Sequence, residues 1–105
     1  MILELLAATS IATSAVEVWT AGDDGLTQRF AENFRTATRE ITGQPLKATV
    51  AQITPAPGGK WLTVVAFSRE GKEVYAAKCT RDEVELQQCA MEAASVAKRL
   101  TRQVR

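Results

Sequence analysis

The sequence predicts a single α+β domain of order β-α-β-β-β-α, in which two helices pack on one face of a mostly antiparallel sheet. Two segments repeat apolar residues at steps of three and four, which is the helical period. Other segments alternate or concentrate apolar residues over short runs, as strands do. The chain of 105 residues has the length of one domain, and no internal repeat or long linker divides it.

A mostly apolar run opens the chain at residues 2–12, is interrupted by Glu4, and leads into three small residues that end at Ala15. Such a pattern is typical of a secretory signal peptide, here with cleavage after Ala15. The run is shorter than the ~20 residues that a membrane-spanning helix needs. The interruption by Glu4 and the lack of Lys or Arg before the run favour the alternative, a retained N-terminal helix.

We therefore expect a signal-like segment at residues 1–15 and the α+β domain at residues 16–105. Removal of the first segment would place the protein in the periplasm or outside the cell. A retained segment would instead indicate a cytoplasmic protein.

The domain begins with a short strand at residues 16–19, where apolar and polar residues alternate briefly. A turn follows, and either Asp23 or Asp24 is placed to cap the next helix by accepting bonds from its free N–H groups. Gly43 and Pro45 predict the end of that helix. Its apolar stripe consists of Leu26, Phe30, Phe34, Ala37 and Ile41.

Three further strands are expected. Residues 46–50 alternate, which indicates one solvated face, and residues 54–59 form a loop because they contain two prolines and two glycines. Residues 61–67 are apolar at both odd and even positions, as in an interior strand covered on both sides. Glu70-Gly71 predicts a tight hairpin turn into the antiparallel strand 74–79.

The last helix has a clear start signal. Thr80 and Glu83 match a capping box, in which each side chain satisfies the other's backbone N–H. Acidic residues open this helix and basic residues close it, as the helix dipole prefers. Its apolar stripe is Leu86, Ala90, Ala93, Ala97, Leu100 and Val104.

The two cysteines, Cys79 and Cys89, lie ten positions apart and lack the spacing of a CxxC redox motif. Three interpretations are open: buried thiols, a redox pair, or a structural disulfide. The signal-like start favours the disulfide. Because bridged Cα atoms lie within about 7 Å, the bridge is less strained if the helix begins near Glu83, with Cys89 in its second turn.

Composition excludes several kinds of chemistry. The chain has no histidine, so His-based triads and His metal sites are absent. Gly58-Gly59-Lys60 resembles the end of a phosphate-binding loop, but Trp61 replaces the required Ser or Thr. Ser68 and Ser95 lack the setting of a catalytic serine. We expect no catalytic residue, no metal site and no cofactor.

Two sets of residues are candidates for binding. Tryptophan often anchors interfaces when it is exposed, so Trp19 and Trp61 would mark an interface if they were adjacent and uncovered. The basic C-terminal segment would contact anionic lipid or nucleic acid, although the overall charge of +1 gives no strong nucleic-acid signal. The candidate contacts in that segment are Lys98, Arg99, Arg102 and Arg105.

These observations favour a non-enzymatic exported domain that binds a protein or an envelope component through a sheet face or edge. An inhibitor or immunity protein that blocks a secreted enzyme is the main alternative, since small size and a disulfide suit both. Binding to an anionic surface through the last helix, and an enzyme that uses carboxylates or lysine, are less favoured. An unpaired edge strand would also allow a homodimer.

Overall fold

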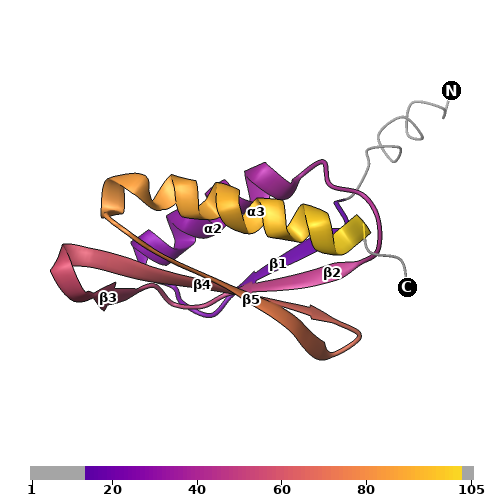
Figure 1. Cartoon of the computed structure of the whole chain (residues 1–105), viewed down its shortest axis with the longest axis horizontal. Helices are drawn as coiled ribbons and strands as arrows, with labels where there is room; N and C mark the ends of the chain where they lie inside the picture. The colour runs from indigo at the N-terminus through magenta and orange to yellow at the C-terminus, as the bar shows by residue number, and fades with distance from the viewer. Residues whose placement is uncertain (1–13, 103–105) are drawn as a thin grey trace, which may run out of the picture.

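Two helices cover one face of a five-stranded sheet, which confirms the α+β class and the element order expected from the sequence (Figure 1). The computed structural model describes residues 14–102, so most of the signal-like segment and Arg105 lie outside the described residues. The elements are β1 (Val16–Thr20), α2 (Gly25–Thr38), β2 (Leu46–Val50), β3 (Thr54–Ala56), β4 (Lys60–Arg69), β5 (Lys72–Arg81) and α3 (Leu86–Arg102). Short 3-10 helices occupy Pro57–Gly59 and Glu83–Glu85.

Strand β4 is the centre of the sheet. It pairs antiparallel with β5 from Trp61 to Arg69, while β2 and β3 pair with separate halves of its other edge. Strand β1 pairs in parallel with β2, because α2 carries the chain back across the sheet between them. Among the described residues, β1 and β5 are the edge strands at the two sides of the sheet, and the short β3 also has a free outer edge.

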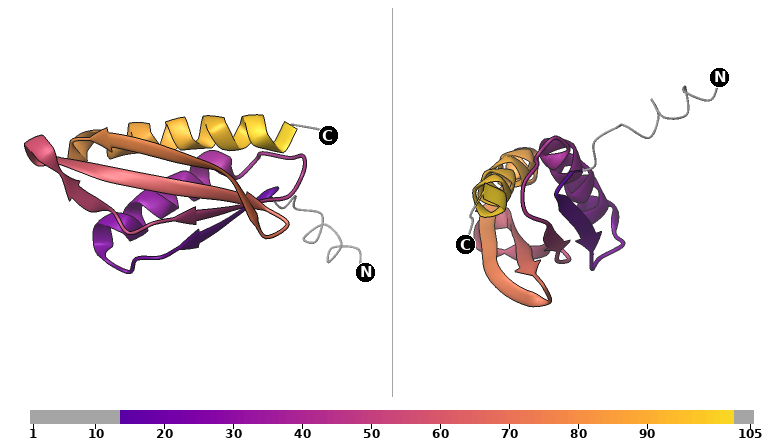
Figure 2. Two further views of the ribbon diagram at one scale, coloured as in Figure 1. Left: turned by 60° about the horizontal axis from the view of Figure 1, so that its bottom comes forward. Right: turned by 90° about the vertical axis from the view of Figure 1, so that its right-hand side faces the viewer.

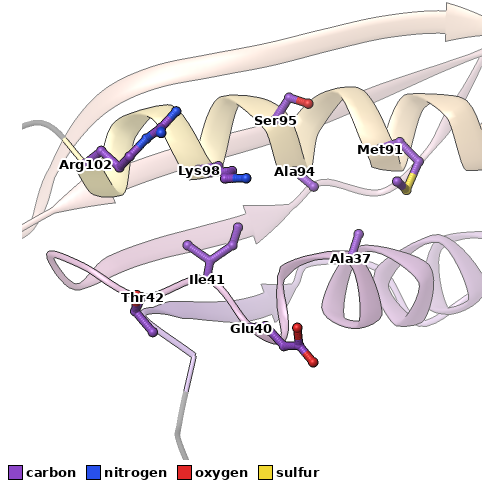
Figure 3. Close-up of a pocket in the computed structure, with 9 residues that line it drawn as sticks. All are labelled: Ala37, Glu40, Ile41, Thr42, Met91, Ala94, Ser95, Lys98 and Arg102. Carbon is purple, nitrogen blue, oxygen red and sulfur yellow. The ribbon is translucent and has the colours of Figure 1, made fainter.

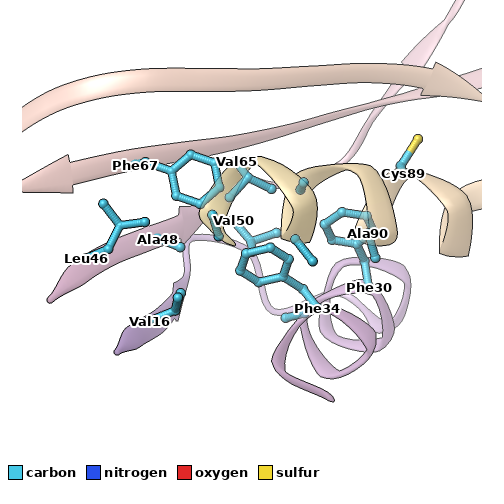
Figure 4. Packing of buried hydrophobic residues seen from close by; sticks show 14 of the residues in the cluster. Val16, Phe30, Phe34, Leu46, Ala48, Val50, Val65, Phe67, Cys89 and Ala90 are labelled. Carbon is cyan, nitrogen blue, oxygen red and sulfur yellow. The ribbon is translucent and has the colours of Figure 1, made fainter. Parts of the chain in front are cut away.

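The core lies between the helices and the sheet (Figure 4). Phe30 and Phe34 of α2 point into it, as the helical stripe predicted. The ring of Phe34 lies 6.2 Å from that of Phe67 on β4, centroid to centroid. Opposite them, small residues of α3 such as Ala90 and Ala97 are fully buried, so this helix approaches the core closely.

Asp24 is the residue that caps α2, in agreement with the sequence. Its carboxylate accepts the N–H of Thr27 at 3.0 Å and the Thr27 hydroxyl at 2.8 Å. These bonds favour the charged carboxylate and lower the pKa of Asp24. The Thr27 hydroxyl oxygen in turn accepts the N–H of Ile53 at 3.0 Å, so the cap also fixes the segment between β2 and β3.

Helix α2 ends earlier than its apolar stripe suggested. It stops at Thr38, and Ile41 lies beyond the helix in a turn. The N–H of Ile41 donates to the Thr38 carbonyl at 3.1 Å. Gly43 is not the helix cap that the sequence indicated. It has φ of +134° and lies against the backbone of Thr101 in α3, where a side chain would not fit.

The segment 54–59 is not the irregular loop that its composition predicted. Thr54–Ala56 forms strand β3, in which Pro55 lies opposite Trp61 of β4. Proline cannot donate to a strand ladder, but β3 pairs on one side only, and an edge position of this kind tolerates the missing N–H. Residues 57–59 then turn the chain into β4.

The capping box expected at Thr80 and Glu83 is wrong. Thr80 belongs to β5, which continues to Arg81, and a 3-10 turn at Glu83–Glu85 precedes α3. The helix therefore begins at Leu86 and places Cys89 in its first turn rather than its second. The late start keeps Cys89 close enough to β5 to meet Cys79.

Strand β4 is covered on one face only, contrary to the expectation from residues 61–67. Both helices lie on the same side of the sheet (Figure 2). On the opposite side Leu62, Val64 and Ala66 are half-buried, and no second layer of described residues covers them. Their partial burial comes from side chains of the neighbouring strands and not from a second layer.

Candidate functional site

The disulfide predicted from the sequence is present. Cys79 and Cys89 are bonded, with Cα atoms 5.7 Å apart. Beside the bridge, the Arg81 guanidinium donates to the Glu92 carboxylate at 2.6 Å. Covalent and ionic contacts thus join the end of β5 to the start of α3.

The candidate functional site is the face of the sheet that the helices leave uncovered, here called the open sheet face. We define it by Glu17 and Trp19 of β1, Lys47 and Thr49 of β2, Leu62, Val64 and Ala66 of β4, and Ala76 and Lys78 of β5. Strand alternation places these side chains opposite the buried ones. The face combines a half-buried apolar centre on β4 with charged residues on β1, β2 and β5.

Trp19 is the most prominent apolar group of the open sheet face. Its side chain is 51% exposed, because β1 is an edge strand and no element of residues 14–102 packs over it. The ammonium of Lys47 lies 5.1 Å from the centre of its ring, a cation–π distance. Half of the residue's surface stays available for contact.

Trp61, the other tryptophan considered for an interface, lies on the opposite face of the sheet. It shares the parity of Thr63 and Val65, which are buried beneath the helices, and it packs against the core. The two tryptophans therefore do not form one patch. The sequence did not single out Lys47, since only the parallel register of β1 with β2 brings it beside Trp19.

A second feature is a groove between the C-terminal end of α2 and the middle of α3 (Figure 3). It encloses about 500 Å³, a size that small ligands use. Its floor is apolar, and Met91 at one end is 54% exposed. The lining residues are Ala37, Glu40, Ile41, Thr42, Met91, Ala94, Ser95, Lys98 and Arg102.

The basic segment of α3 lies partly in the groove. Lys98 and Arg102, one helical turn apart, line it together with the acidic Glu40. Arg99 follows Val96 by three positions and is exposed on the side of α3 that faces β5. Arg102 in turn follows Arg99 by three positions, so it is a neighbour of Arg99 as well as of Lys98 on the helix surface.

The residues considered for other chemistry have structural contacts. Asp24 caps α2, and Lys60, which follows the two glycines, pairs with Asp82 at 3.3 Å. Within residues 14–102, no three His, Cys, Asp or Glu side chains come together as a metal site would require. No helix in this part of the chain is long and apolar enough to cross a membrane.

Comparison with known proteins adds no relative: no family model and no curated protein matches the chain.

Proposed function

We propose that this protein is a non-enzymatic, exported domain that binds another protein through the open sheet face. The observation that carries the proposal is the exposure of Trp19 on a sheet face that no second layer of residues 14–102 covers. An exposed tryptophan offers a large, rigid contact area at low entropic cost, and tryptophan is enriched among residues that dominate binding energy.

The charges around Trp19 specify how a partner would be recognised. Lys47 lies beside the ring and Glu17 is on the same strand face. A partner that covers the indole would bring its own polar groups against these two charges. The half-buried Val64 and Ala66 provide the apolar surface next to them.

Export is the second part of the proposal. A disulfide is compatible with an oxidising compartment, and the apolar run at residues 2–12 is typical of a secretory leader. The mature domain would then act in the periplasm or outside the cell. An inhibitor or immunity protein is the special case in which the partner is a secreted enzyme.

Photo-crosslinking tests the binding surface. A photoreactive benzoylphenylalanine replaces Trp19 in one variant and Val84 in a control, because Val84 is 88% exposed but lies before α3 on the helical side. We expect a discrete adduct from position 19 alone. The captured protein, once purified, should bind the unmodified domain and lose at least ~10-fold affinity with Trp19→Ala but not with Val84→Ala.

Equal crosslinking from both positions would contradict the proposal. So would a captured protein whose affinity is the same for Trp19→Ala and for the unmodified domain. Identification of that protein as a secreted enzyme that loses activity in the complex would distinguish an inhibitor from an assembly partner.

A further inference from the structure

The outer edge of β5 is open. Strand β5 pairs with β4 along its length, and no other strand of the described chain pairs with it. In Figure 2, α3 runs above β5 on one face of the sheet and leaves the strand at the margin. The backbone N–H and C=O groups on that margin are therefore available to a further strand.

The usable length of this edge is defined by a bulge. The β4–β5 register shifts between Phe67 and Ser68, so the hairpin end of β5 is irregular. A bulge twists an edge and interrupts regular pairing. The regular portion of β5 is Tyr75–Arg81, and the disulfide at Cys79 fixes it to α3.

A cavity of about 190 Å³ lies between this portion of β5 and α3. Ala77 contributes to its floor and Val96 of α3 to its opposite wall, and the small side chain of Ala77 leaves the space unfilled. Tyr75, 46% exposed, borders it toward the hairpin end, and the disulfide borders it toward the other end. The cavity has the volume of about six water molecules, enough for one large apolar side chain.

The charges along the edge are mainly positive. Within the described residues, neither Lys72 nor Lys78 forms a salt bridge, whereas Arg81 is neutralised by Glu92. Arg99 adds a further positive charge from the facing side of α3, and the acidic Glu73 lies at the bulged end. An added strand would meet Lys78 near the middle of the regular portion.

We infer that the free edge of β5 binds an extended acidic peptide of a partner protein, which adds as a further strand to the sheet. The peptide residue opposite Ala77 is apolar and enters the cavity below Val96. Its neighbour opposite Lys78 is acidic, because successive side chains of a strand point to opposite faces. This mode combines backbone hydrogen bonds for affinity with one pocket for specificity.

A second copy of this chain fits the edge poorly. Antiparallel pairing of Tyr75–Arg81 with its own copy centres on Lys78 and sets two lysines side by side, which is unfavourable. An acidic strand from a partner, in place of a second copy, puts a carboxylate beside Lys78 and avoids this repulsion. The β5 edge lies across the sheet from β1 and shares with the open sheet face only the side of β5 that carries Ala76 and Lys78, so this inference rests on the free edge and not on Trp19.

Fluorescence anisotropy with synthetic peptides tests the inference. The probe is a fluorescein-labelled peptide of alternating glutamate and valine, seven residues long, and the counterpart carries lysine in place of glutamate. We expect the glutamate peptide to bind at least ~10-fold more tightly at low salt. Two further forms of the glutamate peptide carry N-methyl groups on alternate residues, so that each form has the N–H groups of one backbone edge blocked. Only the form that is blocked on the edge facing β5 should lose affinity.

Variants locate the site. Ala77→Leu fills the cavity and Lys78→Glu reverses the charge, and each should weaken the glutamate peptide at least ~10-fold. Lys78→Glu should also strengthen the lysine peptide. Arg39→Glu, a matched charge reversal at an exposed position just after α2, should change neither affinity.

Equal affinity for the two peptides, or no binding up to about 1 mM, would overturn the inference. Equal effects of the two N-methylated peptides would exclude an added strand. A dimer of the unmodified protein in sedimentation that the glutamate peptide does not dissociate would assign the edge to a second copy instead.

Discussion

The N–H of Gln44 donates to the carbonyl of Thr101 at 3.0 Å, which joins the loop after α2 to the last turn of α3. Gly43 makes this approach possible, since a Cβ atom at that position would overlap the Thr101 carbonyl. The contact closes one end of the helical layer above the sheet.

Gly43→Ala should therefore destabilise the domain by about 3 kcal/mol, because the backbone must leave a positive φ and move away from Thr101. Urea unfolding measures the change. Gly25→Ala is the matched control: its Cβ meets nothing within 4 Å, and it should change the unfolding free energy by no more than about 0.5 kcal/mol. Equal effects of the two substitutions would contradict the close approach.

The Cys79–Cys89 bridge should contribute about 2–3 kcal/mol to the free energy of unfolding, since it closes a loop with a sequence separation of 10. Reduction of the unmodified protein should lower the urea midpoint accordingly. The double variant Cys79→Ala/Cys89→Ala should show no response to reductant. A response of the same size in the double variant would mean that the stabilisation has another source.

Asp24 should make stability depend on pH at acidic values. The bonds from Thr27 lower its pKa in the folded state from an ordinary value of 3.8, so the stabilisation is present above that value and is lost as pH falls below it. Thermal unfolding should give a lower Tm for Asp24→Ala than for the unmodified protein at pH 7. The difference should shrink as the pH falls through and below 3.8.

Asp24→Asn is the control for this effect, because asparagine keeps a capping oxygen but cannot ionise. It should preserve most of the Tm at pH 7 and lose the acid dependence that belongs to this carboxylate. A Tm difference between the unmodified protein and Asp24→Ala that stays constant down to pH 2 would contradict the assignment.

Two residues before β1 are part of the fold. Ala15 donates to the Ile41 carbonyl at 2.8 Å and accepts from Leu46 at 2.9 Å, and the Ser14 hydroxyl donates to Thr38 at 2.7 Å. A chain that starts at Val16 lacks these bonds. It should be less stable than a chain that starts at Ser14 by about 2 kcal/mol, measured by urea unfolding of the two truncated forms. Equal stability would show that these bonds are energetically neutral.

Much of the fold could be predicted because local signals agreed with the tertiary arrangement. The positions of Phe30 and Phe34 follow from helical periodicity, and the Asp24 cap follows from the preference of helix starts for short polar side chains. The turn at Glu70-Gly71 also follows from a local signal, because both residues have the positive φ that a tight hairpin requires.

The remaining features depend on contacts between distant parts of the chain. Pro55 forms a strand because β4 offers a free edge, and α3 begins late because Cys89 must reach Cys79. Lys47 joins Trp19 through a parallel register that no local pattern encodes. Local sequence patterns specify periods and caps, but they do not specify which edges and faces stay open.

The central claim is that this domain works beyond the cytoplasm as a disulfide-bonded binding module. Intact-mass measurement of the protein purified from its own cells, alkylated without reductant, tests this most directly. We expect a chain that lacks the apolar segment 2–12 and takes up no alkylating group, because Cys79 and Cys89 are bonded. A chain that begins at Met1 and carries two alkyl groups would contradict the account.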